Sequence, residues 1–268
     1  MRVEFCPLAS GSRGNCLYLA TEKTRILIDA GLSVKAIAER LAMIGAKLEE
    51  IQGILVTHDH VDHVRGISLL AAKLKIPVFA NSDTARGILQ INRGVALPFK
   101  IFSTGEAFVF NDLEIHPFSI QHDTLDPVAF TIQIGDTKIG ICTDLGCVTT
   151  LVRSHLQNTN YLYLEANHQP SMVHACNRPM IYKQRVLSRQ GHLSNEECAD
   201  LIESIFHDNL KHIYLAHLSS ECNHPDLALA IVQNKLTSLK AQTQLSIAWQ
   251  EEPSVVSIWH ACEPSRAQ

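Results

Sequence analysis

Residues 53–66 read GILVTHDHVDHVRG, and this stretch decides how the rest of the chain is interpreted. Its apolar start, Ile54-Leu55-Val56, predicts a buried strand. Five side chains that titrate or bind metal follow within six positions: His58, Asp59, His60, Asp62 and His63. Such crowding at the end of a buried strand is typical of a metal site and not of a solvated loop.

The spacing within this motif predicts two groups of ligands. In an extended segment that leaves a strand, alternate side chains point the same way. His58 and His60 therefore face one point, while Asp59 faces away. Asp62 and His63 open the next helix and offer a second pair. Imidazole and carboxylate together suit Zn²⁺, the favoured ion, although His/Asp sites also bind Mn²⁺ and Fe.

A site for two metals needs more ligands than this motif holds. Three later residues follow apolar, strand-like runs, and these are His122, Asp144 and His217. The ligand count is then complete. One metal would be held by His58, His60 and His122, and the other by Asp62, His63 and His217. Asp144 would bridge the two ions.

Composition limits the class of protein. A chain of 268 residues with 46% hydrophobic content can bury a sizeable core. Its formal net charge of -4 gives no overall attraction to nucleic acid or membranes, so an anion-binding surface must be local. We find no apolar run of roughly 18 residues, as a membrane span needs, and no secretion signal in MRVEFCPLAS. Its eight cysteines form no C-x-x-C pair, so we expect reduced thiols and a cytoplasmic protein.

The rest of the chain alternates strand-rich and helical segments. Helices are expected over 33–45, 64–75, 194–206 and 225–236. Strands are expected over 15–20, 24–31, 53–58, 76–80, 100–104, 107–110, 113–120, 128–135, 137–144, 160–166, 212–219 and 245–250. Two sheets with helices outside satisfy this order. We expect one domain over 1–262 and a frayed tail over 263–268.

The motif THDHVDH resembles the signature of the metallo-β-lactamase superfamily. His122, the segment TDLG around Asp144 and the segment LAHLS around His217 follow in the order and spacing of that family's later ligand motifs. The resemblance covers nearly the whole chain. It implies an α/β fold, the four-layer αββα sandwich, with a dinuclear metal site at one edge between the sheets.

Two further segments resemble the nuclease branch of this family. They are YLEANHQ (163–169) and RQGHLSNEECADL (189–201), which are similar to the progression found in ribonuclease Z. The resemblance implies that His192 is the general acid for the leaving group and that Glu165 orients it. The alternative is a polar residue at a helix N-terminus and a plain strand end. Lactamases proper usually carry another residue at the step of Asp144 and have signal peptides, and this chain has neither feature.

A narrower resemblance is to the YycJ/WalJ group of small metallo-hydrolases, which are regarded as 5′ exonucleases or DNA-processing phosphodiesterases. It is carried by LASGSRGNC (8–16), HDTLDPVAF (122–130), GHLSNEECA (191–199) and HLSSECNHPDLA (217–228). The chain lacks the long arm with which ribonuclease Z grips tRNA and has no room for a β-CASP insertion. This favours DNA over RNA and leaves a small phosphodiester open.

Candidate phosphate contacts lie in two polar segments. RPMIYKQRVLSRQ (178–190) places four cations shortly before His192: Arg178, Lys183, Arg185 and Arg189. They are candidates for contacts to successive phosphates, where affinity comes mainly from charge, and a solvated loop or helix face is the alternative. The turn SGSRGN, with Ser12 and Asn15, offers backbone N–H groups to an anion or is simply a tight connection.

Together these features predict a metal-dependent hydrolase of phosphodiester bonds in nucleic acid, with DNA favoured. A metal-bridging hydroxide is the expected nucleophile, because zinc-bound water titrates near roughly pH 7. Asp62 would orient it, and His192 would protonate the departing alkoxide. The competing classes are a cyclic phosphodiesterase or thioesterase of the same fold and a non-catalytic binding protein. The intact ligand set argues against the last, and the sequence predicts no oligomeric state.

Overall fold

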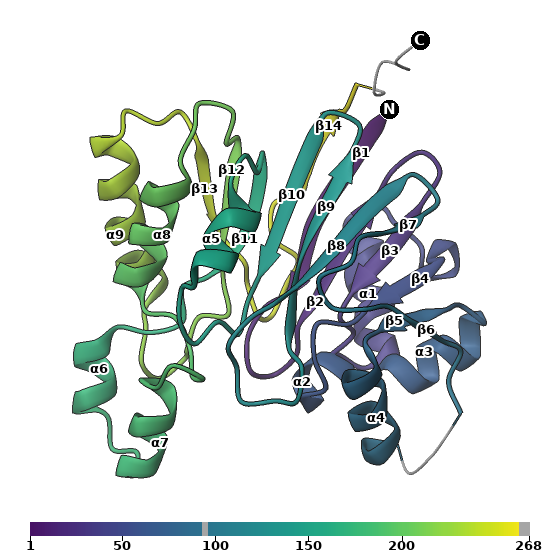
Figure 1. Ribbon diagram of the computed structural model, residues 1–268, viewed down its shortest axis with the longest axis horizontal. Coiled ribbons are helices and arrows are strands. Elements are labelled where there is room, and N and C mark those ends of the chain that lie inside the picture. Colours follow the sequence, from purple (N-terminus) through teal and green to yellow (C-terminus); the bar gives the residue numbers. More distant parts are fainter. Residues whose placement is uncertain (93–95, 263–268) are drawn as a thin grey trace.

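The computed structural model describes residues 1–92 and 96–262, and within them the chain forms two sheets of seven strands each. The sheets face one another, and helices cover both outer faces (Figure 1). This four-layer αββα arrangement confirms the predicted fold class. The expected tail at 263–268 lies outside the described residues.

The first sheet and its helices come mainly from the N-terminal half. In spatial order its strands are β14 (Ser257–His260), β1 (Arg2–Ala9), β2 (Cys16–Ala20), β3 (Arg25–Ile28), β4 (Gly53–Leu55), β5 (Val78–Ala80) and β6 (Phe99–Ile101). The helical segments of this half are α1 (Val34–Met43), the 3₁₀ turn η1 (Leu48–Glu50), α2 (Val61–Val64), α3 (Ile67–Leu74) and α4 (Ser82–Ile91).

The second sheet comes from the C-terminal half. In spatial order its strands are β13 (Gln244–Ile247), β12 (His212–Ala216), β11 (Tyr161–Glu165), β10 (Thr137–Cys142), β9 (Val128–Ile134), β8 (Leu113–Ser119) and β7 (Phe108–Phe110). The helices of this half are α5 (Thr150–Leu156), α6 (Pro170–Ala175), α7 (Met180–Val186), α8 (Asn195–Ile205) and α9 (Pro225–Ser238).

Strands buried on both faces explain the long apolar runs of the sequence. Every position of β12 is buried, and all of β11 except Tyr161 is buried. Side chains alternate between faces, so Leu162 and Leu164 pack against the helices while Tyr163 packs between the sheets. The interior therefore has three apolar layers, one between the sheets and one under each set of helices.

Parallel pairing brings the ends of several strands to one edge. In the first sheet β3, β4, β5 and β6 run parallel. In the second sheet β10, β11, β12 and β13 run parallel. Residues that follow these strands therefore gather at a common edge, where α/β proteins usually bind their ligands.

Most predicted elements are present close to their expected ends. The hairpin predicted over 15–31 is present as antiparallel β2 and β3. Ser33 caps α1 as expected, and Ser194 caps α8 through a capping box with Glu197. These side chains satisfy backbone N–H groups that have no partner inside the helix.

The helix predicted over 64–75 is wrong in one respect. The structure has two helices there, α2 and α3, and Gly66 lies between them. The Gly66 N–H donates to the carbonyl of Ala30 at 2.7 Å, and a Cβ at Gly66 would collide with the carbonyl of Leu32. This close crossing holds α2 against the loop that follows β3.

The buried His212 of β12, away from the edge just described, allows a test of how the stability of the fold depends on pH. It is 3% exposed, and its ring nitrogens lie 2.7 Å and 2.8 Å from the hydroxyls of Ser257 and Ser246. Burial lowers the pKa of His212 to about 4. In the unfolded chain a histidine titrates near pH 6.5, so the unfolded state takes up a proton first as pH falls. The stabilisation is complete above about pH 6.5 and is lost toward pH 4.

We therefore expect wild-type protein to lose about 3 kcal/mol more free energy of unfolding than His212→Gln between pH 7 and pH 4. Glutamine can bond both serines and does not titrate. Urea unfolding followed by circular dichroism at a series of pH values measures this difference. Equal pH slopes for the two proteins would show that His212 does not contribute.

Candidate metal centre

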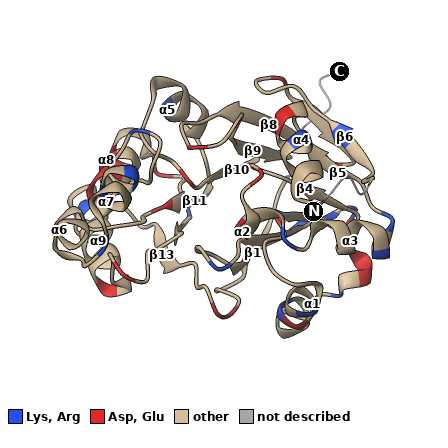
Figure 2. Ribbon diagram, turned by 90° about the horizontal axis from the view of Figure 1, so that it is seen from below, with Lys and Arg blue, Asp and Glu red and all other residues tan. Residues whose placement is uncertain are grey.

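The seven predicted metal ligands follow strands of both sheets and meet at the shared edge. His58, His60, Asp62 and His63 follow β4, His122 follows β8, Asp144 follows β10 and His217 follows β12. Figure 2 looks onto this side of the molecule, with α2 facing β10 and β11. We call these seven residues the ligand centre.

The first predicted group, His58, His60 and His122, is assembled. Ligand atoms of the three lie within 4.8 Å of one another. Nε2 of His122 is 3.3 Å from Nδ1 of His60. These three nitrogens could share one ion.

The second predicted group, Asp62, His63 and His217, is assembled in the same way, with ligand atoms within 4.8 Å of one another. Oδ2 of Asp62 is 3.6 Å from Nε2 of His63 and 3.8 Å from Nε2 of His217. This group offers two nitrogens and one carboxylate oxygen.

Asp144 lies between the two groups. Its Oδ2 is 3.2 Å from Nε2 of His63 in the second group. Its Oδ1 is 3.7 Å from Nε2 of His122 in the first group and 3.6 Å from Nε2 of His217 in the second. The structure thus brings all seven residues together, with Asp144 where a bridging carboxylate would be needed.

The donor set fits divalent metals, and the hydrogen bonds behind it support this. Nδ1 of His63 lies 2.7 Å from Asp29, that of His122 lies 3.1 Å from the carbonyl of Gly191, and that of His217 lies 3.2 Å from Glu165. Metal-binding histidines are commonly held in this way. Within the described part of the chain, the buried Nε2 atoms of His58 and His217 find no hydrogen-bond partner. Such an atom costs about 1–3 kcal/mol, which a cation would relieve.

The charges of the centre also suit a cation. Burial opposes ionisation of Asp144, but His217 and His63 outweigh it and hold the pKa of that carboxyl well below its usual range. Burial opposes a charged His217, but Asp144, Asp62 and Glu165 outweigh it and raise the pKa of His217 to about 10. Burial and the neighbouring His63 keep the pKa of His58 well below its usual value. The carboxyl of Asp144 is therefore ionised, and metal binding would displace a proton from His217.

Unusual backbone conformations occur at three residues of the site. Asp29, Asp144 and His217 have φ of 59°, 54° and 53°, in the left-handed region. Residues other than glycine rarely adopt it, at a cost on the order of 1–3 kcal/mol each. Each of the three follows a strand closely, so the chain turns sharply where the side chain enters the site.

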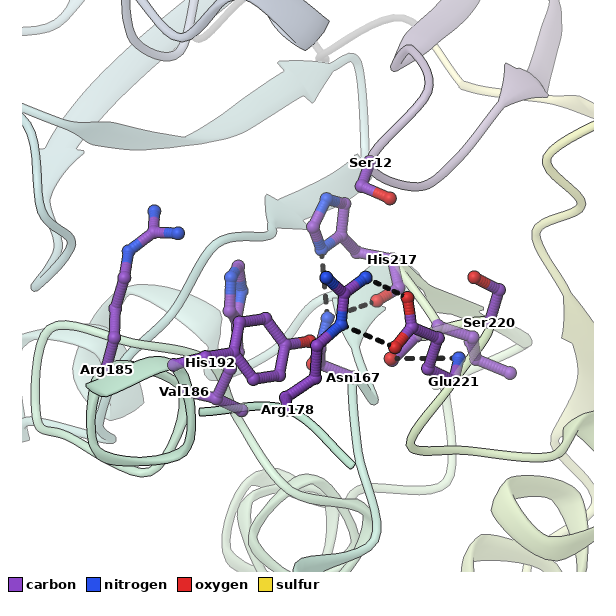
Figure 3. A pocket seen from close by; sticks show the side chains of 12 residues that line it. Ser12, Asn167, Arg178, Arg185, Val186, His192, His217, Ser220 and Glu221 are labelled. Atoms are coloured by element: carbon purple, nitrogen blue, oxygen red, sulfur yellow. Dashed lines mark hydrogen bonds and ion pairs between the residues drawn. The ribbon is translucent and has the colours of Figure 1, made fainter. Parts of the chain in front are cut away.

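Glu165 and His192 form the predicted pair. Nδ1 of His192 lies 2.8 Å from Oε1 of Glu165, and the backbone N–H groups of Leu145 and Leu193 donate to the other carboxylate oxygen. Burial would raise the pKa of Glu165, but His192 and His217 outweigh it and bring that pKa to about 2. The His192 side chain is 15% exposed and lines, with His217, a cavity of about 210 Å³ (Figure 3). The arrangement can hold a proton donor at the edge of the centre.

Comparison with known proteins shows the family of this chain. Residues 24–217 match the β-lactamase superfamily domain. The exodeoxyribonuclease YycJ of Bacillus anthracis is 36% identical over 237 residues, which are 88% of this chain and 90% of that protein. The exodeoxyribonuclease WalJ of Streptococcus pneumoniae is 35% identical over 243 residues, 90% of this chain and 89% of that protein. The chain belongs to the metallo-β-lactamase superfamily.

A solved structure shows the same superfamily fold. The metallo-β-lactamase fold protein YhfI from Bacillus subtilis has a TM-score of 0.72 at 12% identity, over 96% of this chain and 99% of that one. At this identity the likeness concerns the fold alone. Within the described ranges, no helix of this superfamily member has the length and apolarity needed to cross a membrane.

The residues predicted to contact phosphate have different surroundings in the structure of this superfamily member. Ser12 and Arg185 line the cavity beside His192. Arg189 lines a separate cavity on which His192 also borders. Nζ of Lys183 donates to the carbonyl of His174 at 2.7 Å. The sequence does not distinguish these positions.

Asn15 is placed differently from the turn residues around it. Its side chain accepts from the Gly11 N–H at 2.8 Å, and its amide lies 3.2 Å from Asp62 and 2.9 Å from Nε2 of His63. It therefore braces the ligands of this metallo-β-lactamase fold, and its side chain is engaged within the protein.

Two buried residues of the site are absent from the sequence-based prediction. Asp29 contacts His63, and Asn167 contacts Nδ1 and the carbonyl of His217 at 3.2 Å and 2.7 Å. Asp29 carries the same signal as the predicted ligands, because it directly follows the apolar run over 26–28. Asn167 follows β11 by two residues, as Asp144 follows β10, but its amide is not a usual metal ligand.

We expect Asp29→Asn to weaken metal binding by about 10- to 100-fold while the fold is retained. The carboxylate of Asp29 fixes the ring of His63 and also accepts from the N–H and hydroxyl of Thr57 at 2.9 Å and 2.8 Å. Asparagine keeps an acceptor for Thr57 but loses the charge beside His63. Competition with a chromogenic chelator measures the affinity. Asp112→Asn is the control, because Asp112 accepts from the hydroxyl of Thr24 in a comparable way away from the centre.

Proposed function

We propose that this protein is a metal-dependent phosphodiesterase that digests nucleic acid as an exonuclease, with DNA as the favoured substrate. The observation that carries the proposal is the assembled ligand centre with the Glu165–His192 pair beside it. Two relatives named exodeoxyribonuclease, each matching 88% or more of this chain, support DNA as the substrate.

The ligand centre would hold two divalent cations, with Zn²⁺ favoured because the first group consists of three imidazoles. Bound there, such cations act as Lewis acids on phosphate oxygens and make a nucleophile available from water at neutral pH. Because the ligands follow strands of both sheets, the centre needs both sheets folded together. This supports the proposal that residues 1–262 form one domain.

Asp62 and His192 would act on opposite sides of the reacting phosphate. Asp62 is the more open carboxylate, with a side chain 24% exposed against 3% for Asp144, and would orient the attacking water. His192 has Nδ1 directed at Glu165, which leaves Nε2 to give a proton to the departing oxygen. Glu165, whose Oε1 lies 2.8 Å from Nδ1 of His192, would hold the ring in the orientation that this step requires.

The Glu165–His192 pair favours a phosphodiester over a thioester. An alkoxide is a poor leaving group and needs a proton as the bond to phosphorus breaks, whereas a thiolate leaves without one. A buried carboxylate that holds a histidine at the edge of the cavity, as Glu165 holds His192, is expected in the first case. The pair therefore bears directly on substrate class.

The experiment is digestion of end-labelled single- and double-stranded DNA and RNA with Zn²⁺, Mn²⁺ or chelator. A small aryl phosphodiester and a cyclic nucleotide are assayed in parallel. We expect metal-dependent release of mononucleotides, faster from DNA than from RNA. Greater activity on the cyclic nucleotide than on DNA would replace the proposal with its small-molecule alternative, and a fully loaded protein inert on all phosphate esters would refute both.

A further inference from the structure

The helices α6 and α7 form a small projection beside the ligand centre. In Figure 1 they lie below α8 and α9, apart from the two sheets. A satellite apolar cluster fixes them, with Val173, Val186 and Cys222 at its core and Tyr182 packed against it. We call residues 170–189 the arm.

The second half of the arm is strongly basic. Between residues 178 and 189 the sequence has four cations and no acidic residue: Arg178, Lys183, Arg185 and Arg189. The chain as a whole carries a formal charge of -4. A local concentration of positive charge on an acidic protein indicates an anionic partner that binds at this surface, and not a non-specific affinity of the whole protein for anions.

Two of these cations line the cavity that contains His192 and His217 (Figure 3). Arg178 donates through Nε to Glu221 at 2.8 Å, and its guanidinium carbon is 5.3 Å from the centre of the Tyr182 ring. Arg185 is paired with Asp123. Each guanidinium has five N–H donors, so both keep free donors while a carboxylate from another loop fixes their position. Pre-positioned donors bind phosphate at a lower entropic cost.

Apolar side chains are exposed next to these cations. Met180 and Ile181 are 66% and 74% exposed on α7. Ile181 precedes Arg185 by one helical turn, so the two lie on the same face. The surface of α7 therefore places an exposed aliphatic side chain beside an arginine.

A single nucleic-acid strand presents the matching chemistry. Its bases are unstacked and have apolar faces, and its phosphates repeat along the backbone. A duplex presents the phosphates but keeps its bases inside. The adjoining cavity of about 210 Å³ is also smaller than the roughly 300–1,000 Å³ of pockets for drug-sized ligands, so it suits part of one nucleotide.

We infer that the arm is a binding surface for a single nucleic-acid strand, with phosphates on Arg178 and Arg185 and a base against Ile181. The end of the strand then lies at His192. The inference rests on the proposed function and specifies its substrate: a single strand, or the unpaired end of a duplex.

The test measures binding, so it does not depend on catalysis. The probe is fluorescein-labelled oligothymidylate with phosphorothioate linkages, which resist digestion, bound to the metal-loaded full chain and followed by anisotropy. The main variant is Arg178→Gln/Glu221→Gln, which removes one charge of each sign and leaves the net charge unchanged. Arg2→Gln/Glu4→Gln is the matched control, because that pair is 2.9 Å apart and Arg2 is 54% exposed against 50% for Arg178.

We expect the main variant to bind the strand about tenfold more weakly, with a salt dependence shallower by about 0.7 in log–log slope, as the loss of one phosphate contact requires. Ile181→Ser should weaken binding by roughly fivefold without changing that slope. The control should match wild type. Affinity for a blunt duplex of equal length, which keeps its bases inside, should fall less than affinity for the strand in both arm variants.

Three results would overturn the inference: wild-type affinity in the main variant, an equal loss in the control, or an equal loss for duplex and single strand. Circular dichroism spectra identical to wild type establish that each variant is folded. If wild-type protein binds the strand but hydrolyses no phosphate ester, the proposed function fails and the arm's role in binding remains.

Discussion

Asp144→Asn is expected to lose bound metal and to reduce phosphodiester hydrolysis by more than about a thousandfold, a loss of about 4 kcal/mol of transition-state stabilisation. Asp144 is the residue that approaches both groups of ligands, with oxygens 3.2 Å from His63 and 3.7 Å from His122. Without its charge, one carboxylate and five imidazoles remain for two dications. Asparagine also tolerates the left-handed backbone at this position, where φ is 54°.

The measurement is metal content by mass spectrometry after dialysis against buffer, together with the melting temperature. Asp59→Asn is the matched control, because Asp59 belongs to the same motif but bonds to the hydroxyl of Thr124. The control should keep its full metal content. An Asp144→Asn protein that retains two ions per chain would remove Asp144 from the ligand set.

His192→Ala should keep the metals of the wild type and lose about 10²- to 10⁴-fold in kcat on DNA. The side chain contacts Glu165 at 2.8 Å and faces the cavity. Its ligand atom lies within 4.8 Å of those of Asp144, Glu165 and His217, but each of the two groups assigned to the metals has three ligands without it. The loss should be much smaller on an ester with a nitrophenolate leaving group, because that group departs without a proton. His260→Ala, which alters an exposed histidine of β14, is the control.

This comparison of substrates separates proton donation from a structural role. A residue that only supports the fold would reduce hydrolysis of both substrates alike and would lower metal content or melting temperature. Full activity of His192→Ala on DNA would end the assignment of the general acid. Glu165→Gln should resemble His192→Ala in its substrate dependence if Glu165 acts through His192.

The ligand centre could be predicted because its signal is local in the sequence and its assembly follows from topology. His122, Asp144 and His217 each follow a strand of the second sheet, and the strands before Asp144 and His217 are almost wholly buried. Parallel strands end at a common edge, so residues after them come together without any knowledge of contacts. Asp29 obeys the same rule and could have been found by applying it to every strand.

Some elements absent from the prediction contain residues that disfavour them locally. β1 contains Pro7 and lies between β2, its neighbour in sequence, and β14, whose His260 lies opposite Arg2. A proline within such a run argues against a central strand when only the local sequence is considered. Helix α4 contains Gly87, which lowers helix propensity. A Cβ at Gly87 would collide with the carboxylate of Asp59, so the glycine makes room for the metal-binding loop.

The short helices α5, α6 and α7 were also unpredicted. α6 and α7 have six and seven residues, below the length at which periodicity identifies a helix. Because these helices are so short, the sequence does not show which cations of the segment reach the cavity. Arg178 and Arg185 do so because Glu221 and Asp123, from other loops, hold them there.

Titration of metal-free protein with Zn²⁺ in a calorimeter tests most directly whether seven side chains from both sheets form one dinuclear centre. We expect saturation at two ions per chain with proton release, and recovery of phosphodiester hydrolysis only as the second ion binds. Saturation at a single ion, or binding that is unchanged in Asp144→Asn, would contradict the dinuclear centre.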